Sequence, residues 1–157
     1  MLGRRKEEQW DGSDRRAAST VLIVNDDPAA CEMLERMVSS KGFNAIGATS
    51  PDEALWRAVE ELPRCVVLDL DAGGIGTSLK LLDVIRSHED LRVSTARVVL
   101  CAASPKNRSF SFQSGADSFM VRPFHLDELA EQIDDVLGRA HEQRARHRRD
   151  ELAKHGD

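Results

Sequence analysis

The segment "TVLIVNDDP", residues 20–28, decides the fold class. "TVLIV" is a short, continuous run of apolar and β-branched residues, which is the pattern of a strand buried on both faces of a parallel sheet. Asp27 and Pro28 then suit the N-cap and the first position of a helix. Asn25 and Asp26 complete a polar group at the end of the strand. Neighbouring carboxyl-type side chains repel one another unless a cation lies among them, so the segment also indicates a cation site.

The same alternation of strand and helix continues along the chain. The predicted strands are the runs "TVLIV", "NAIGAT", "CVVLDL", "ARVVLCA" and "SFMV". The predicted helices follow them at residues 28–42, 51–62, 79–89, 104–117 and 125–140, the fourth being serine-rich and only one or two turns long. Five strand–helix units of this length predict an α/β fold with a parallel sheet and helices on both faces.

The length of 157 residues suits one domain with short extensions. Residues 1–19 are charged and poor in apolar side chains, so we expect a flexible N-terminal arm. The domain itself is expected over residues 20–138. Residues 139–157 are rich in arginine and predict a basic helical tail that runs out past the domain.

Composition argues against several classes of protein. The formal net charge of −5 disfavours a nucleic-acid-binding domain, although the C-terminal end is basic. The apolar stretches are all shorter than the roughly 20 residues that span a bilayer, and the N-terminus does not resemble a signal peptide. Cys31, Cys65 and Cys101 lie inside apolar runs and are expected to be buried thiols of a reducing compartment. We therefore expect a cytoplasmic protein that does not bind membranes.

Acidic side chains should gather at one edge of the predicted sheet. Ligands of open α/β sheets bind outside the carboxyl ends of the strands, where Asp26, Asp69 and Asp71 are expected, with Arg122 as a cation from the fifth strand. Hard oxygen ligands of this kind suit Mg²⁺, which takes one or two carboxylates and keeps water in its other positions. Clustered His or Cys ligands that would suit zinc are not evident in the sequence.

Three blocks of sequence then resemble the signature of response-regulator receiver domains, the phosphoacceptor modules of two-component signalling. They are "VLIVNDDP", "CVVLDLD" and "GADSFMVRPF", and their order and spacing agree with that family over roughly residues 20–138. The resemblance implies a doubly wound, five-stranded parallel sheet of flavodoxin-like strand order, the (βα)5 receiver fold.

The resemblance also implies roles for individual residues. Asp69 matches the phosphoacceptor. Asp26 and Asp69 match the carboxylates that bind Mg²⁺, with the backbone carbonyl of Asp71 as a third ligand and Asn25 as a weak or indirect one. The positions that contact the phosphoryl group or switch with it are matched by Arg122, Ala102 and Phe119. The peptide bond between Arg122 and Pro123 is expected to be cis.

Three of these positions depart from the family's pattern. Asn25 removes a negative charge where an aspartate is usual, so the affinity for Mg²⁺ should fall. Ala102 has no hydroxyl, which removes a hydrogen bond to the phosphoryl group worth about 1.5–3 kcal/mol. Arg122 replaces a lysine by a planar fork, which is not a conservative exchange in such a site.

The leading functional hypothesis is a stand-alone receiver domain of a phosphorelay signal transduction system, a phosphoprotein rather than an enzyme. It would accept a phosphoryl group on Asp69 with Mg²⁺ from a histidine kinase or phosphotransfer protein. It would then signal by protein–protein contacts with an output protein not identified by the sequence, or with a second copy through the fourth and fifth helices and the adjoining strand.

Three alternatives stay open at this point. A pseudo-receiver would act as a phosphorylation-independent interaction module. An adaptor would touch nucleic acid through the basic tail, which we do not expect. An enzyme of flavodoxin-like fold is the weakest alternative, because no phosphate-cradling loop follows the first strand.

Overall fold

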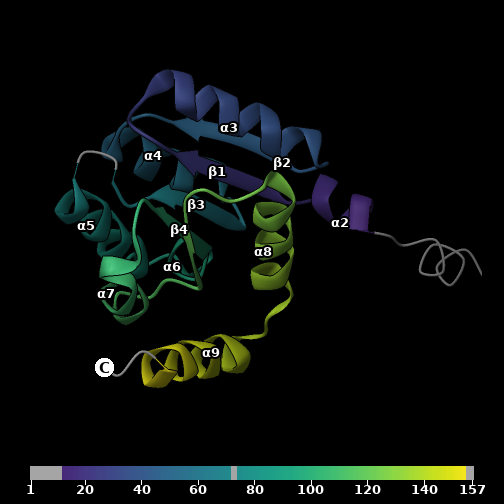
Figure 1. Cartoon of the computed structure of the whole chain (residues 1–157). Helices are drawn as coiled ribbons and strands as arrows, with labels where there is room; N and C mark the ends of the chain where they lie inside the picture. Colours follow the sequence, from purple (N-terminus) through teal and green to yellow (C-terminus); the bar gives the residue numbers. More distant parts are fainter. Residues whose placement is uncertain (1–11, 72–73, 155–157) are drawn as a thin grey trace, which may run out of the picture.

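A parallel β-sheet forms the central layer of the structure, a computed structural model that describes residues 12–71 and 74–154. Within these residues the chain forms a five-stranded sheet in the order β2-β1-β3-β4-β5, and all neighbouring strands are parallel. The strands are β1 (Thr20–Val24), β2 (Asn44–Ala48), β3 (Cys65–Asp69), β4 (Arg97–Ala102) and β5 (Ser118–Val121). The predicted doubly wound, flavodoxin-like fold is therefore confirmed (Figure 1).

Helices cover both faces of this sheet. The longer helices are α3 (Pro28–Ser40), α4 (Pro51–Glu61), α5 (Ile75–Arg86), α8 (Leu126–Gly138) and α9 (His141–Lys154), and the short ones are α2 (Gly12–Ala17), α6 (Leu91–Ser94), the 3-10 turn η1 (Pro105–Asn107) and α7 (Arg108–Gln113). Val21 and Ile23 of β1 pack in the cluster that contains the buried residues of α3 and α8. Leu22 and Val24 pack in the cluster shared with α4, α5, α6 and α7, as the alternation of side chains along a strand requires.

The first two major helices begin at the predicted residues. Asp27 Oδ1 accepts a hydrogen bond from the backbone N–H of Ala29 at 3.1 Å, and Pro28 occupies the first helical position of α3. Ser50 Oγ accepts from the N–H of Glu53 at 3.1 Å at the start of α4. These caps satisfy backbone donors that have no partner inside the helix. The predicted N-terminal caps of both helices are confirmed.

The region around the third helix differs from the prediction. Helix α5 spans Ile75–Arg86 rather than residues 79–89, and α6, which the sequence pattern did not predict, follows it. Asp90 caps α6 by accepting from the N–H of Arg92 at 2.9 Å. The guanidinium of Arg86 donates to the carbonyls of Ser94 at 3.0 Å and Ala96 at 2.6 Å, so this connection is held by a side chain of α5. The serine-rich segment forms only η1 and α7, as predicted.

The N-terminal arm is structured over part of its length. Residues 12–17 form α2, and Arg16 donates to the Asp134 carboxylate of α8 and, at 3.0 Å, to the carbonyl of Lys41. The Arg16 guanidinium also lies 5.1 Å from the ring centroid of Phe43. The prediction of a flexible arm is therefore wrong for residues 12–19, while residues 1–11 lie outside the described part of the chain.

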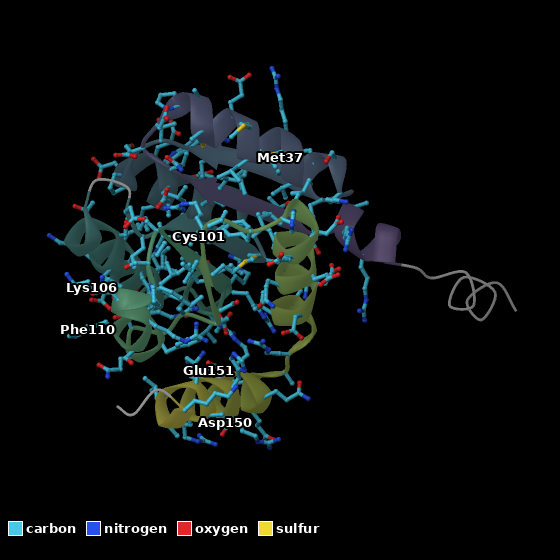
Figure 2. All side chains as sticks on the ribbon, viewed as in Figure 1. Met37, Cys101, Lys106, Phe110, Asp150 and Glu151 are labelled. Carbon is cyan, nitrogen blue, oxygen red and sulfur yellow. The ribbon has the colours of Figure 1, made fainter. Side chains whose placement is uncertain are left out.

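The basic tail is helical, but it does not run out past the domain. Helix α9 turns back beneath the domain, next to α7 (Figure 1). Arg144 and Glu151 of α9 are buried, and Glu151 lies on the side of the helix that faces the domain whereas Asp150 lies on the opposite side (Figure 2). This docking could not be predicted from the sequence, because the helix has no apolar stripe and is held largely by ion pairs.

No helix in residues 12–71 and 74–154 has both the length and the apolar character needed to span a bilayer.

Candidate functional site

The candidate site lies where β1 and β3 end at the carboxyl edge of the sheet. Val24 of β1 is paired with Leu68 of β3, which places Asn25 and Asp69 side by side at the next position. Asn25 Nδ2 donates a hydrogen bond to Asp69 Oδ2 at 2.9 Å. The N–H of Asn25 is held by the carbonyl of Ala48 at 3.1 Å, so β2 also supports this position. The expected convergence of polar side chains from the first and third strands is present.

The Asp69 carboxylate is bound on both of its oxygens. Oδ2 accepts from Asn25, while Oδ1 accepts from the backbone N–H of Asp71 at 2.9 Å and from Arg122 Nη2 at 3.3 Å. The side chain of Asp69 is 15% exposed, against 38% for Arg122. The Asp69 carboxylate is thus largely enclosed and faces one guanidinium, that of Arg122.

Arg122 binds a second carboxylate more closely than the first. Its Nη2 donates to Asp71 Oδ2 at 2.7 Å, and the same oxygen accepts from the backbone N–H of Ala103 at 2.9 Å. Arg122 follows β5, Ala103 follows β4 and Asp71 follows β3, so three strand ends meet at this oxygen. The peptide bond between Arg122 and Pro123 is cis.

Asp26 and Asp27 have separate surroundings. Asp27 serves as the cap of α3, and its backbone N–H donates to Asn25 Oδ1 at 3.0 Å. Asp26 lies between them with an exposed side chain at the end of β1. Because Asn25 Oδ1 accepts from Asp27 and Nδ2 donates to Asp69, the orientation of the Asn25 amide is determined by its two partners.

Ala102 and Phe119 lie in the core rather than in the polar group around Asp69. Both belong to the hydrophobic cluster that includes α5 and α7, and their exposures are 3% and 7%. The guanidinium of Arg108 lies 5.6 Å from the ring centroid of Phe119 and 5.3 Å from that of Phe112. The carbonyl of Ala102 accepts from the N–H of Arg122 at 2.8 Å, which links the ends of β4 and β5.

The oxygen ligands that the site offers are of the type that Mg²⁺ prefers. Asp26 and Asp69 offer carboxylates and Asp71 a backbone carbonyl, and two carboxylates suffice for an ion that keeps several waters. Asn25 does not contribute a ligand as it lies, because it turns its NH₂ group toward Asp69. Among the described residues no group of three or more His, Cys, Asp or Glu side chains could hold a metal ion, so binding here would rest on a small ligand set.

The cysteine nearest in the sheet does not add a nucleophile. Cys101 is paired in register with Asp69, but its thiol is buried in the α3–α8 cluster. Burial raises the pKa of the Cys101 thiol to about 12, although the charge of Arg122 opposes this. All three cysteines are buried and free, as the sequence analysis expected.

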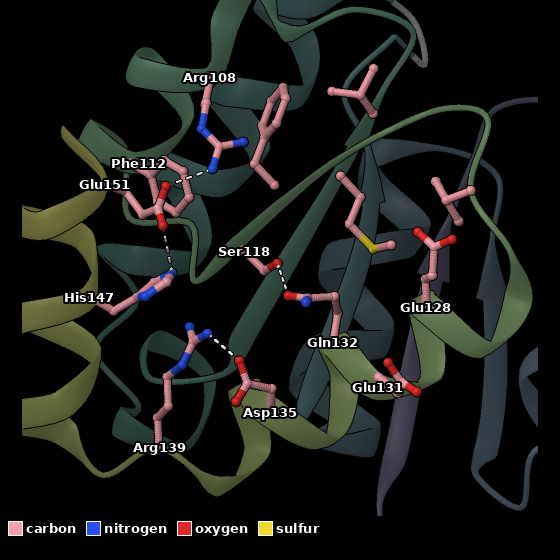
Figure 3. Close-up of a pocket in the computed structure, with 14 residues that line it drawn as sticks. Arg108, Phe112, Ser118, Glu128, Glu131, Gln132, Asp135, Arg139, His147 and Glu151 are labelled. Atoms are coloured by element: carbon pink, nitrogen blue, oxygen red, sulfur yellow. Dashed lines mark hydrogen bonds and ion pairs between the residues drawn. The ribbon is translucent and has the colours of Figure 1, made fainter. Parts of the chain in front are cut away.

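A hollow of about 480 Å³ borders the candidate site at Arg122 and Ala103, and a second one lies away from Asp69. A groove of about 420 Å³ lies between α7, β5, α8 and α9. Its floor includes Phe112, Phe119 and Met120, and Figure 3 shows Glu151 of α9 reaching Arg108 across one end. Charged side chains such as Glu128, Glu131 and Arg139 surround this apolar floor.

The pairing of the Asp71 carboxylate with Arg122, and the N–H of Ala103, were not predicted from the sequence. Asp71 was expected among the acids at this edge, but only its backbone carbonyl was given a role, although a second acid two residues after Asp69 is visible in "LDLDA". That signal could have suggested a competitor for Arg122. The role of the Ala103 N–H depends on the path of the chain after β4, which sequence does not reveal.

Comparison with known proteins agrees with the fold. The model of the response regulator receiver domain family matches residues 21–134. The transcriptional regulatory protein PrrA of Mycobacterium tuberculosis is 32% identical over 123 residues, which cover 76% of this chain and 50% of PrrA. The cell cycle transcriptional regulator CtrA of Caulobacter vibrioides is 28% identical over 121 residues, covering 76% and 51%. The chain thus spans about half the length of the curated relatives it matches.

A solved structure gives the same result for the fold alone. The chemotaxis response regulator CheY4 of Vibrio cholerae superposes with a TM-score of 0.66 at 19% identity, covering 75% of this chain and 98% of CheY4. The strand order, the polar edge formed by β1 and β3, and the match over residues 21–134 agree with one another. The chain belongs to the family of response regulator receiver domains, the signalling domains of two-component systems.

Proposed function

We propose that this receiver domain accepts a phosphoryl group on Asp69. The observation that carries the proposal is the position of the Asp69 carboxylate, enclosed at the end of β3 between Asn25 and Arg122. The donor would be the phosphohistidine of a histidine kinase or of a phosphotransfer protein. The output would be a protein–protein contact, and we propose no enzymatic turnover of a small substrate.

The proposed step is an in-line transfer to an oxygen of Asp69. That oxygen forms a bond to phosphorus, while the bond from phosphorus to the donor's nitrogen or oxygen breaks and its electron pair leaves with the donor. Asn25 and the N–H of Asp71 hold the carboxylate in one orientation, and Arg122 lies beside it as a counterion for the transferred group. Asp26, Asp69 and the carbonyl of Asp71 would hold Mg²⁺, whose contribution when bound is to neutralise charge on the phosphoryl oxygens.

The face formed by α7, β5 and α8 is the proposed output surface. It carries the groove of about 420 Å³, and Phe119 in its floor lies three residues before Arg122. A second copy of the chain is one candidate partner for this face. The curated relatives are transcriptional regulators of about twice the matched length, so we do not carry DNA binding over to this chain.

Incubation with acetyl phosphate and Mg²⁺ tests the proposal. Intact-protein mass spectrometry should detect one added phosphoryl group on the wild type and none on Asp69→Asn. Asp83→Asn makes the same exchange on the exposed face of α5 and should react like the wild type. A folded wild type that gains no phosphoryl group, or an Asp69→Asn variant that gains as much, would refute the proposal.

A phosphorylation-independent interaction module is the second candidate function. It is favoured by one observation: both oxygens of Asp69 already have hydrogen-bond partners within the chain, from Asn25, Asp71 and Arg122. An anion that is satisfied in this way gains less from a metal ion or from a phosphoryl donor. A folded wild type that stays unmodified in the mass experiment would support this second candidate.

A further inference from the structure

Two anion-binding donors converge on the side chain of Asp71. Arg122 Nη2 and the backbone N–H of Ala103 reach Asp71 Oδ2 at 2.7 Å and 2.9 Å. The donors come from two different strand ends, so the contact is not a local turn of the chain around its own aspartate. Hydrogen bonds to a charged group are shorter and stronger than neutral ones, and a guanidinium with a main-chain N–H is a common way to bind phosphate.

Arg122 is shared unequally between two carboxylates. The same nitrogen that lies 2.7 Å from Asp71 Oδ2 lies 3.3 Å from Asp69 Oδ1. Asp71 is the more exposed of the two acids, at 43% against 15% for Asp69. Arg122, the counterion beside Asp69, is therefore bound mainly by Asp71, the more exposed of the two acids.

We propose that the Asp71 carboxylate is an intramolecular competitor for the phosphoryl group, occupying Arg122 and the Ala103 N–H until that group displaces it. This inference rests on the proposed function of Asp69. A phosphoryl group carries a charge of about −1.5 to −2 at neutral pH. It therefore repels Asp71, and it binds Arg122 and the Ala103 N–H more strongly than a single carboxylate does. Asp71 thereby acts as a positioning residue: it holds the donors in place before transfer and opposes transfer itself.

The structure explains why this acid does not merely cap a turn. An aspartate that serves its own turn accepts from N–H groups one to three residues onward, whereas Asp71 accepts from residue 103 and residue 122. Its own backbone N–H donates to Asp69 Oδ1 at 2.9 Å, and its carbonyl accepts from Gly74 at 3.2 Å. The backbone N–H of Asp71 thus binds the Asp69 carboxylate, while the side chain of Asp71 binds Arg122 and the Ala103 N–H.

Asp71→Asn tests the inference, with Asp83→Asn as the matched control for loss of one negative charge. We expect Asp71→Asn to incorporate phosphate from acetyl phosphate roughly twofold to fivefold faster than the wild type, the range of a partly exposed ion pair. The phosphorylated form should also persist longer, because Arg122 then has no competing carboxylate at Asp71. Equal rates in the wild type, Asp71→Asn and Asp83→Asn would overturn the inference while leaving the function of Asp69 intact.

A second comparison separates competition for Arg122 from a general effect of charge. In an Arg122→Gln background, Asp71→Asn should bring little further gain, because the shared donor is gone. The same gain in both backgrounds would overturn the inference. If the wild type does not react but Asp71→Asn does, Asp71 by itself blocks transfer to Asp69: the competition is supported, while the proposed function fails for the wild-type chain. If neither reacts while both stay folded, the inference and the proposed function both fail.

A readout without phosphoryl transfer gives an independent check. The backbone amide signal of Ala103 in NMR spectra should move on addition of inorganic phosphate in Asp71→Asn. In the wild type it should move less at the same phosphate concentration, because Asp71 occupies the donor. An Ala103 signal that responds equally in both proteins would contradict the proposed competition.

Discussion

Arg144 and Asp117 form a buried ion pair that fastens α9 to the rest of the domain. Arg144 Nε donates to Asp117 Oδ1 at 2.7 Å and Nη2 donates to Oδ2 at 3.1 Å. Asp117 is fully enclosed, and it also accepts from Arg86 at 3.0 Å and from the N–H of Val98 at 2.9 Å. Arg148 lies at 3.4 Å from the same carboxylate. One acid thus joins α5, β4 and α9, and it binds two of the tail's cations, Arg144 and Arg148.

Replacing Asp117 by asparagine should be strongly destabilising. The amide cannot neutralise Arg86 and Arg144, and uncompensated buried charge costs about 3–5 kcal/mol when one partner of a buried pair is removed. Asp150→Asn, on the outward side of α9, should change the free energy of unfolding by less than about 0.5 kcal/mol. Urea denaturation of the two variants measures the difference, and a loss below about 1 kcal/mol for Asp117→Asn would contradict the central role of this carboxylate.

The stability of the protein should fall in acid through Asp117. Burial would raise the pKa of this carboxyl, but the hydrogen bond and charge of Arg144, with the charge of Arg86, hold its pKa below the ordinary value of 3.8. The unfolded chain therefore takes up the proton first, so the stability from Asp117 is fully present above about pH 4 and is lost as the pH falls through the lower folded pKa. The free energy of unfolding measured against pH should drop less steeply below that range in Asp117→Asn. Parallel curves for the two proteins would show that other groups dominate.

Arg108 connects the end of α9 to the aromatic residues of the groove. Its guanidinium donates to Glu151 Oε2 at 2.6 Å and lies over the rings of Phe112 and Phe119. Glu151→Gln should weaken this link by about 1–2 kcal/mol and speed hydrogen exchange in the second half of α9. Arg149→Gln, an exposed change on the same helix, is the control. Combining Arg108→Gln with Glu151→Gln should cost less than the sum of the two, and strict additivity would mean that the pair is not coupled.

Gly115 is a position where an added methyl group should be poorly tolerated. Its φ is +105°, and a Cβ there would lie 2.9 Å from Arg86 Nε, whose guanidinium donates to the Gly115 carbonyl at 3.0 Å. We expect Gly115→Ala to lower the free energy of unfolding by more than about 1 kcal/mol. Gly76→Ala in α5, where a Cβ would meet nothing within 4 Å, should be neutral or stabilising by up to about 1 kcal/mol. Equal effects at both glycines in thermal or urea unfolding would contradict this account.

Local signals in the sequence predicted most of the fold. Continuous apolar runs gave the strands, because a strand covered on both faces needs apolar side chains throughout. Asp27 with Pro28, and Ser50 with Glu53, predicted where two helices begin, since capping acts within a few residues. Helix α6 was missed because its position depends on Arg86, which reaches the carbonyls of Ser94 and Ala96 from another helix.

The sequence predicted which residues form the candidate site, but not which of them bind one another. The sequence indicated that Asn25, Asp69 and Arg122 meet at one edge, because the carboxyl ends of parallel strands share that edge. It did not indicate that Asn25 would turn its NH₂ group to Asp69, or that Arg122 would lie closer to Asp71 than to Asp69. Those choices depend on fractions of an ångström between loops that follow different strands.

The amino-acid sequence by itself determined the alternation of strands and helices, the caps and the set of polar residues at the sheet edge, because each of these follows from spacing and from the properties of near neighbours. Only the tertiary structure decided which of the 22 Lys and Arg side chains meets which acid. Two such pairings are the contact of Arg144 with Asp117, which docks α9, and the sharing of Arg122 by Asp69 and Asp71. Ion pairs form between residues far apart in the chain, and their strength depends on burial and distance, which exist only once the sheet has brought the strand ends together.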